Sequence, residues 1–238
     1  MTEEEGVDLA RLIEKAVDGE DLSAEEAEGA FDRFMTGTAT DAQMAGLLVA
    51  LRAKGVQPVE VAGGVRALRK AMVPVPTSRS RKLVDTAGTG GGRITTFNIS
   101  TAADLVAAGA GIPIAKHGNR SFTSRSGSAD VLEALGVKIA LDPERMGEIL
   151  DEVGIVFMFA PLLHPAMRHV GPVRRDLRLT TVMNVLGPLT NPAGARRQVI
   201  GVADARLIDL LSRTLAELSH EHALVVHGEP GMDEISPS

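Results

Sequence analysis

Apolar positions in residues 7–72 recur every three or four residues, the spacing of one face of an α-helix. Two stretches carry their own start signal, because Ser23 with Glu26 and Thr40 with Gln43 fit the capping box, in which two side chains satisfy free N–H groups. Pro58 suits the first turn of a further helix, where no N–H is needed. The pattern predicts helices and no strand here, over residues 7–17, 24–35, 41–54 and 58–72.

A different rhythm follows residues 73–80, whose prolines, serines and threonine disfavour a regular element and indicate a linker. Beyond this segment, short apolar runs alternate with segments of helix length. Strands are predicted at 83–84, 112–115, 155–160, 198–202 and 223–226, and helices at 101–110, 128–135, 143–153 and 205–219. Strands that alternate with helices indicate crossover connections and a mainly parallel sheet.

Residues 164–192 interrupt this alternation. They contain a helical run at 165–177, and residues 183–188 after it show no strand period, so we expect the stretch to pack back onto the helical part. The expected fold class is α/β with two domains. These are a small helical domain, residues 1–75 with 164–192, and a larger α/β domain with a mainly parallel central sheet, residues 76–163 and 193–238.

Composition narrows the class of protein. Its 25 Lys and Arg against 31 Asp and Glu give a net charge of −6, which argues against a nucleic-acid or membrane partner. The chain has no cysteine, which excludes disulfides, thiolate metal sites and cysteine nucleophiles and suits a reducing, cytoplasmic location. No apolar run approaches the ~20 residues of a membrane-spanning helix, and the residues after Met1 are acidic where a secretory signal is basic.

Glycine is concentrated directly after the first predicted strand. Four of the five residues 88–92 are glycine, which lets backbone N–H groups approach an anionic phosphate. The run is neither a G-x-G-x-x-G dinucleotide motif nor a P-loop, which ends in Gly-Lys-Ser/Thr. A phosphate-binding loop is the favoured interpretation, and a tight strand-to-helix turn is the alternative.

Two later polar segments suit the same kind of ligand. Residues 98–101 open an alanine-rich helix, where hydroxyls and the positive end of the helix dipole hold a phosphate or a metal-bound water, or simply cap the helix. Residues 116–120 follow the second strand at the edge where open α/β sheets bind ligands, although a solvated loop could have this composition. The polar loop continues through Ser124, Ser126, Gly127 and Ser128.

Asp233 and Glu234 place two adjacent carboxylates after the last predicted strand. Magnesium prefers one or two carboxylates together with waters and substrate phosphates. The pair therefore suits a magnesium–diphosphate site, and a solvated acidic surface is the alternative.

In this order the segments resemble the anthranilate phosphoribosyltransferase family, whose members join anthranilate to phosphoribosyl pyrophosphate in the second step of tryptophan biosynthesis. The resemblance rests on the glycine run and on residues 116–120, 126–136, 184–192 and 231–236. It implies a Mg²⁺-dependent phosphoribosyltransferase that binds anthranilate and phosphoribosyl pyrophosphate and forms a homodimer through its helical domain.

The resemblance also implies a role for each residue that matches a family motif. It implies contacts to phosphoribosyl pyrophosphate for Gly88, Thr89, Gly90, Gly91, Gly92, Thr96, Asn98, Ile99, Ser100, Thr101, Lys116, His117, Gly118, Asn119, Arg120, Ser124 and Ser128. Contacts to anthranilate are implied for Gly88, His117, Asn119 and Arg174, with Arg174 at the carboxylate, and magnesium ligation for Ser100, Asp233 and Glu234. No strong general base is implied, because the attacking aromatic amine is already neutral at pH 7.

Two departures from the family and two alternatives remain. Gly92 stands where the family usually has an acidic residue, which puts metal affinity in question, and family members continue beyond Asp233 and Glu234, so we expect the α/β domain to be incomplete. The alternatives are a pyrimidine-nucleoside phosphorylase-like enzyme and a catalytically dead, nucleic-acid-binding relative. The presence of Asn119 and Arg174, with the charge of −6, favours the transferase.

Overall fold

The computed structural model describes residues 7–79, 82–90, 97–121 and 126–236. The chain divides into two compact units. The helical unit comprises Met1–Met72 and His164–Leu189, and the α/β unit comprises Val73–Leu163 and Thr190–Ser238.

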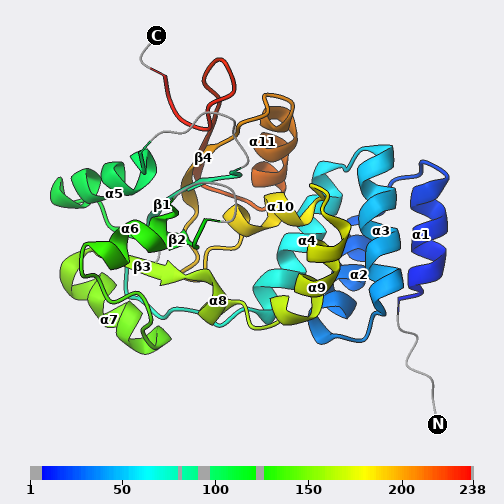
Figure 1. The fold of residues 1–238 in the computed structure, drawn as a ribbon, viewed down its shortest axis with the longest axis horizontal. Coiled ribbons are helices and arrows are strands. Elements are labelled where there is room, and N and C mark those ends of the chain that lie inside the picture. The colour runs from blue at the N-terminus through cyan, green and yellow to red at the C-terminus, as the bar shows by residue number, and fades with distance from the viewer. Residues whose placement is uncertain (1–6, 80–81, 91–96, 122–125, 237–238) are drawn as a thin grey trace. The chain divides into compact units, whose positions relative to one another are not determined.

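The helical unit begins with α1 (Leu9–Val17), α2 (Ala24–Thr36), α3 (Asp41–Lys54) and α4 (Pro58–Ala71). Both expected capping boxes are present, with the hydroxyls of Ser23 and Thr40 accepting backbone N–H groups in the first turns of α2 and α3. The later segment adds α9 (Met167–Leu177), α10 (Met183–Leu186) and a 3₁₀ turn at Gly187–Leu189, and α9 packs against α2 and α3 (Figure 1). The predicted helical N-terminal domain is therefore confirmed.

The α/β unit is built on a five-stranded sheet in the order β3-β2-β1-β4-β5, and every described pairing of strands is parallel. Its strands are β1 (Val84–Gly88), β2 (Ile114–Gly118), β3 (Ile155–Phe159), β4 (Arg197–Gly201) and β5 (His222–Val226). Its helices are α5 (Ile99–Gly109), α6 (Ser128–Ala134), α7 (Pro143–Val153), α8 (Ala160–Leu163) and α11 (Leu207–Glu217). The predicted parallel α/β architecture is confirmed. No helix in the described ranges is long and apolar enough to cross a bilayer.

Two of the strands, β1 and β2, end later than the sequence pattern indicates. Lys116, His117 and Gly118 were expected in a loop, yet they are the last three residues of β2 and pair in register with β3. Gly88 likewise closes β1, beside Gly201 of β4. A polar run resembles a loop in sequence, but the Lys116 side chain is buried in an ion pair, which offsets the cost of placing a charge in a central strand.

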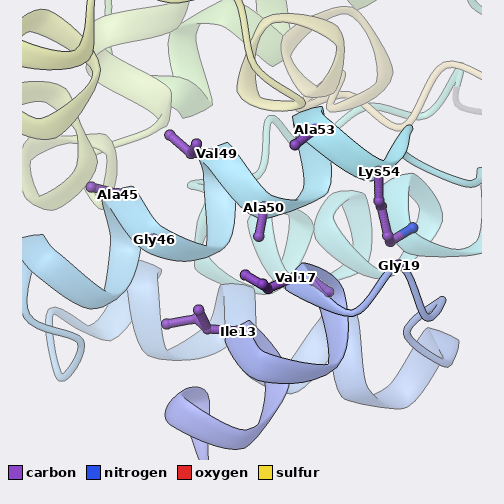
Figure 2. Close-up of a pocket in the computed structure, with 10 residues that line it drawn as sticks. Ile13, Val17, Gly19, Ala45, Gly46, Val49, Ala50, Ala53 and Lys54 are labelled. Carbon is purple, nitrogen blue, oxygen red and sulfur yellow. The ribbon is translucent and has the colours of Figure 1, made fainter.

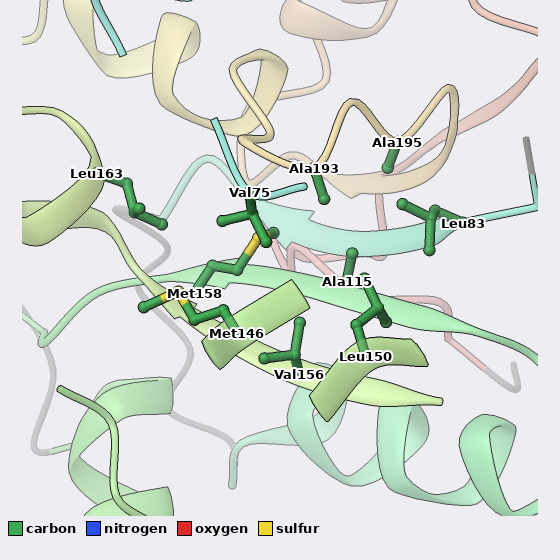
Figure 3. Packing of buried hydrophobic residues seen from close by; sticks show 10 residues of the cluster. All are labelled: Val75, Leu83, Ala115, Met146, Leu150, Val156, Met158, Leu163, Ala193 and Ala195. Carbon is green, nitrogen blue, oxygen red and sulfur yellow. The ribbon is translucent and has the colours of Figure 1, made fainter. Parts of the chain in front are cut away.

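Buried apolar side chains of α7, β2 and β3 form a core, to which the segment before β1 contributes (Figure 3). The cluster comprises Val75, Leu83, Ala115, Met146, Leu150, Val156, Met158, Leu163, Ala193 and Ala195. Val75 belongs to the expected linker, and its N–H donates to the Pro192 carbonyl at 3.0 Å. Residues 73–79 form no helix or strand, as expected. They are not a solvent-exposed linker, because Val73 and Val75 pack into the core of the α/β unit.

Candidate functional site

The carboxyl ends of β1 and β4 are covered by the segment that follows β5. A Cβ atom added to Gly88 would lie 2.8 Å from Asp233 Oδ2, and one added to Gly201 would lie 1.8 Å from the Asp233 carbonyl oxygen. Only glycine leaves room for this close approach. The Thr89 N–H also donates to the Gly201 carbonyl at 2.9 Å. Gly88, Thr89 and Asp233 therefore come together at the edge where parallel sheets bind ligands.

Lys116 is the central cation of this edge. Its ammonium lies 2.7 Å from Asp104 Oδ2, donates to the Thr86 carbonyl at 3.1 Å and donates to the Ser100 hydroxyl at 3.4 Å. The Thr86 hydroxyl lies 2.9 Å from both oxygens of Asp104. Burial raises the pKa of the Asp104 carboxyl, and the charge of Lys116 opposes that rise. Lys116 is thus charge-paired inside the α/β unit while it contacts a predicted ligand-binding hydroxyl.

Glu234 connects the acidic pair to the start of α5. Its carboxylate accepts the backbone N–H of Ser100, in the first turn of that helix. Burial raises the pKa of Glu234, the neighbouring Asp233 raises it further, and the charge of Lys116 lowers it. A helix N-terminus beside a lysine favours negative charge, so Glu234 marks a position suited to anions.

The first turn of α5 carries two more predicted residues. Thr101 Oγ1 is buried and has no hydrogen-bond partner among the described residues, an arrangement that costs free energy unless a ligand or water bonds to it. The Asn98 side chain makes no capping bond and instead donates to the Ser126 carbonyl at 3.2 Å. The Asn98 side chain therefore does not cap α5.

Asn119 and Arg120 bond to residues of α6. The Asn119 carbonyl accepts the Ser128 hydroxyl at 3.3 Å. The Arg120 guanidinium lies 2.9 Å from Asp130 and 2.8 Å from Glu133. These ion pairs give Arg120 a structural contact in addition to the donor contact predicted from the sequence.

Asp85 of β1 lies below this edge and is fully buried. Its carboxylate accepts the His117 N–H at 3.2 Å and the Gln198 side-chain amide at 3.0 Å, and Asn191 also bonds to it. Burial raises the pKa of Asp85, and these hydrogen bonds together with the charge of Lys116 only partly oppose that rise. Asp85 therefore fixes the backbone of a predicted site residue from inside the sheet.

Arg174 lies on α9, in the helical unit. It is half-buried, and burial lowers its pKa. No acidic side chain in the described part of the chain pairs with its guanidinium. An arginine in this state suits a carboxylate that comes from outside the protein.

The remaining predicted residues fall into two groups. Gly90, Ile99 and Gly118 lie at the same sheet edge, after β1, at the start of α5 and at the end of β2. Gly91, Gly92, Thr96 and Ser124 lie outside the described residues.

Sequence reasoning missed Asp85, Thr86 and Asp104. Asp104 did carry a signal, because it is the one charged residue in the α5 sequence ISTAADLVAAG. A lone carboxylate in an apolar helix is costly unless it is exposed or paired. Its partner, however, lies on another element and could not be identified from spacing.

The oxygen donors at this edge suit magnesium only if waters and a phosphorylated ligand complete its shell. Within the described ranges, no three His, Cys, Asp or Glu side chains converge to hold a metal unaided. Asp233, Glu234 and the Ser100 hydroxyl are hard oxygen donors, and Mg²⁺ completes its shell with waters and substrate phosphates. The donor set therefore suits a cation shared with a phosphorylated ligand.

Models of one family match both parts of the chain. Residues 80–238 match the a/b domain of a glycosyl transferase family, and residues 10–72 match the helical bundle domain of that family. The chain belongs to this glycosyl transferase family.

The relatives of this glycosyl transferase bear out the resemblance seen in its motifs. The anthranilate phosphoribosyltransferase of Methanosarcina barkeri is 54% identical over 96% of this chain and 62% of its own length. The crystal structure of the Thermus thermophilus enzyme of that name superposes with a TM-score of 0.88 at 48% identity, covering 94% of this chain and 67% of that chain. The Saccharomyces cerevisiae enzyme in complex with PRPP and Mg superposes with a TM-score of 0.87 at 27% identity, covering 96% and 68%. This chain spans about 62% of the length of the first curated relative.

Proposed function

We propose that this glycosyl transferase acts in the cytoplasm and transfers the phosphoribosyl group of phosphoribosyl pyrophosphate to the amine of anthranilate. The observation that carries the proposal is the convergence of Lys116, the start of α5 and Asp233 with Glu234 at one sheet edge. The identity of 48% and 54% to two anthranilate phosphoribosyltransferases supports the choice of substrates.

The donor is expected to bind along the carboxyl edge of the sheet. Thr89, Asn98, Ser100, Thr101 and Lys116 supply N–H, hydroxyl, amide and ammonium groups there. The Thr101 hydroxyl has no hydrogen-bond partner among the described residues, which supports this assignment, because a phosphate oxygen would satisfy it. The first turn of α5 adds backbone N–H groups and the positive end of the helix dipole.

Asp233 and Glu234 would hold Mg²⁺, with Ser100 as a third oxygen donor. When bound, the ion neutralises negative charge on the diphosphate as it leaves. The yeast relative solved with PRPP and Mg supports a magnesium-dependent reaction. The chain's own contribution is to place two carboxylates beside the end of β1, where Gly88 leaves space for Asp233.

The reaction needs alignment and leaving-group stabilisation more than base catalysis. The bond from C1′ of the ribose to the pyrophosphate oxygen breaks while the anthranilate nitrogen forms a bond to C1′, and the nitrogen then loses a proton to water. The developing charge on pyrophosphate is stabilised by Lys116 and by the N–H groups of α5. Because the amine is neutral before it attacks, the absence of an assigned strong base is consistent with the chemistry.

Anthranilate recognition is assigned to Arg174, with Asn119, His117 and Gly88 as further contacts. The guanidinium presents a planar fork that matches a carboxylate. Its half-buried position without a described counter-charge supports this role, because an anthranilate carboxylate would supply the missing partner.

The decay of anthranilate fluorescence on addition of phosphoribosyl pyrophosphate and Mg²⁺ tests the proposal. The protein contains no Trp and no Tyr, so its own emission interferes little. We expect decay that stops when EDTA removes the metal. A protein that melts cooperatively, yet neither consumes anthranilate nor gains thermal stability from phosphoribosyl pyrophosphate, would refute the proposed activity.

We also propose that the helical unit forms a homodimer. An apolar groove of about 590 Å³ lies between α1 and α3, and Figure 2 shows Ile13 and Val17 on one side and Val49 on the other. Val17 is 68% exposed and Val49 is 39% exposed, so a second copy would remove apolar surface from water. Light scattering is expected to give a dimer for the native protein and a monomer for Val49→Glu; a native monomer at micromolar concentration contradicts the proposal.

A further inference from the structure

Asp104 is a buried carboxylate that the proposed reaction does not use. It lies in the middle of α5, its side chain is 1% exposed, and it sits 2.7 Å from the Lys116 ammonium. A site that binds a diphosphate gains affinity from cations. A carboxylate held against the central cation of that site therefore opposes the binding of anions.

The contacts of Lys116 show what a diphosphate has to displace. An ammonium group has three N–H donors. Those of Lys116 are directed at Asp104, at the carbonyl and hydroxyl of Thr86 and, more distantly, at Ser100. All of these acceptors belong to the protein, so a phosphate oxygen that reaches Lys116 must take the place of one of them.

Other carboxylates near Lys116 strengthen the competition between the protein and a diphosphate for its ammonium group. Besides Asp104, the carboxylates of Asp85 and Glu234 interact with the Lys116 charge, and Asp233 adjoins Glu234. Among the described residues, the negative charge at this edge exceeds the positive charge of the lysine. Removing one carboxylate would shift the local potential toward anions.

We propose that Asp104 sets the affinity of the site for diphosphates by holding Lys116 in an internal ion pair when no ligand is bound. The identity of the ligand rests on the proposed function. The pair stabilises the unliganded protein, because a lone buried ammonium is costly, and it weakens anion binding by the same interaction. Asp104 is a positioning residue, since it acts only through Lys116.

Asp104→Asn tests this, because asparagine keeps the shape and one acceptor oxygen but removes the charge. Calorimetric titration with inorganic pyrophosphate and Mg²⁺ is expected to show binding on the order of tenfold tighter than in the native protein. The unliganded variant is expected to melt at a lower temperature, and pyrophosphate is expected to raise its melting temperature more than that of the native protein. Asp209→Asn is the matched control, because Asp209 is an exposed acid on α11 paired with Arg213, and it should change neither quantity.

The double variant Asp104→Asn with Lys116→Met separates charge pairing from folding. Removing both charges is expected to restore thermal stability relative to Asp104→Asn and to weaken pyrophosphate binding below the native level. If the double variant binds pyrophosphate as well as the native protein does, Lys116 is not the anion's partner and the proposal fails. This measurement can still refute the proposal if Asp104→Asn alone does not fold.

Parallel turnover assays keep this proposal distinct from the proposed function. Equal or weaker pyrophosphate binding by Asp104→Asn, with anthranilate turnover in the native protein, overturns the role of Asp104 alone. Tighter binding by Asp104→Asn without turnover in any variant supports the role of Asp104 and removes the proposed function. If neither the native protein nor Asp104→Asn binds pyrophosphate, the role of Asp104 fails, and the turnover assay alone decides the proposed function.

Discussion

A buried lysine–carboxylate pair occurs in each unit, and the two pairs have nearly the same geometry. In the helical unit, Lys54 lies 2.9 Å from Glu60, with side chains 3% and 0% exposed. In the α/β unit, Lys116 lies 2.7 Å from Asp104, with side chains 5% and 1% exposed. Burial and distance alone do not tell which pair belongs to a binding site.

The neighbours of the two pairs are different. The Glu60 carboxylate accepts the Leu22 N–H at 2.8 Å and the Gln57 N–H at 2.7 Å, so it joins the segments that precede α2 and α4. The Lys116 pair instead adjoins the first turn of α5, where Thr101 Oγ1 has no partner within the described residues. A pair closed by backbone groups stabilises the fold, whereas a pair beside unsatisfied polar groups is open to a ligand.

The largest expected effect is a loss of stability when the Lys54–Glu60 pair of the helical unit is broken. Glu60→Ala leaves the ammonium of Lys54 and the N–H groups of Leu22 and Gln57 without their buried acceptor, which is expected to cost about 3–5 kcal/mol of stability. Urea unfolding followed by circular dichroism measures this loss, because the chain lacks Trp and Tyr. Glu60→Gln, which keeps an acceptor, should cost less. Unchanged stability in Glu60→Ala, or a change in pyrophosphate affinity, would show that the Glu60 pair is not purely structural.

A smaller effect is expected at Arg174, which is half-buried like a structural arginine but has no described counter-charge. Arg174→Ala is expected to raise the KM for anthranilate about 10- to 100-fold, the worth of a charge-assisted hydrogen bond, and to leave the KM for the donor nearly unchanged. Steady-state kinetics with each substrate varied in turn gives both constants. Arg175→Ala, an exposed neighbour on the same helix, is the control. Equal increases in both KM values would make Arg174 structural.

Features set by local sequence were predicted well. Helices were predicted over 41–54 and 143–153, and α3 and α7 have these same bounds, because caps, prolines and apolar spacing act within a few residues. The order of strands and helices along the chain was also predictable, since each apolar run becomes a strand of the parallel sheet.

Features set by contacts between distant segments were not predictable. Lys116 was expected in a loop because it opens a polar run after the second predicted strand, and its strand position depends on Asp104, which lies on another element. The closeness of Gly201 to Asp233 likewise appears only after folding, although both residues are visible in the sequence. The motifs therefore supplied residues such as Lys116 and Ser100, which the structure brings into contact, but not the groups that hold them there.

The smallest effect concerns Asp85, a buried acid that accepts hydrogen bonds but no direct bond from a lysine. Burial raises its pKa, so the folded protein binds the proton more tightly than the unfolded chain does. Stability contributed by this group is present below the ordinary aspartate pKa and is lost as pH rises through the raised value. The stability of the native protein minus that of Asp85→Asn should therefore fall with pH above about 4, by at most about 1.4 kcal/mol per pH unit, and then level off.

Asp151→Asn is a control of opposite sign, because hydrogen bonds from Thr77 and Ser78 lower the pKa of Asp151, and that stability is lost as pH falls. Urea unfolding at several pH values measures both differences, and a flat difference for Asp85→Asn would mean that its hydrogen bonds fully compensate for burial.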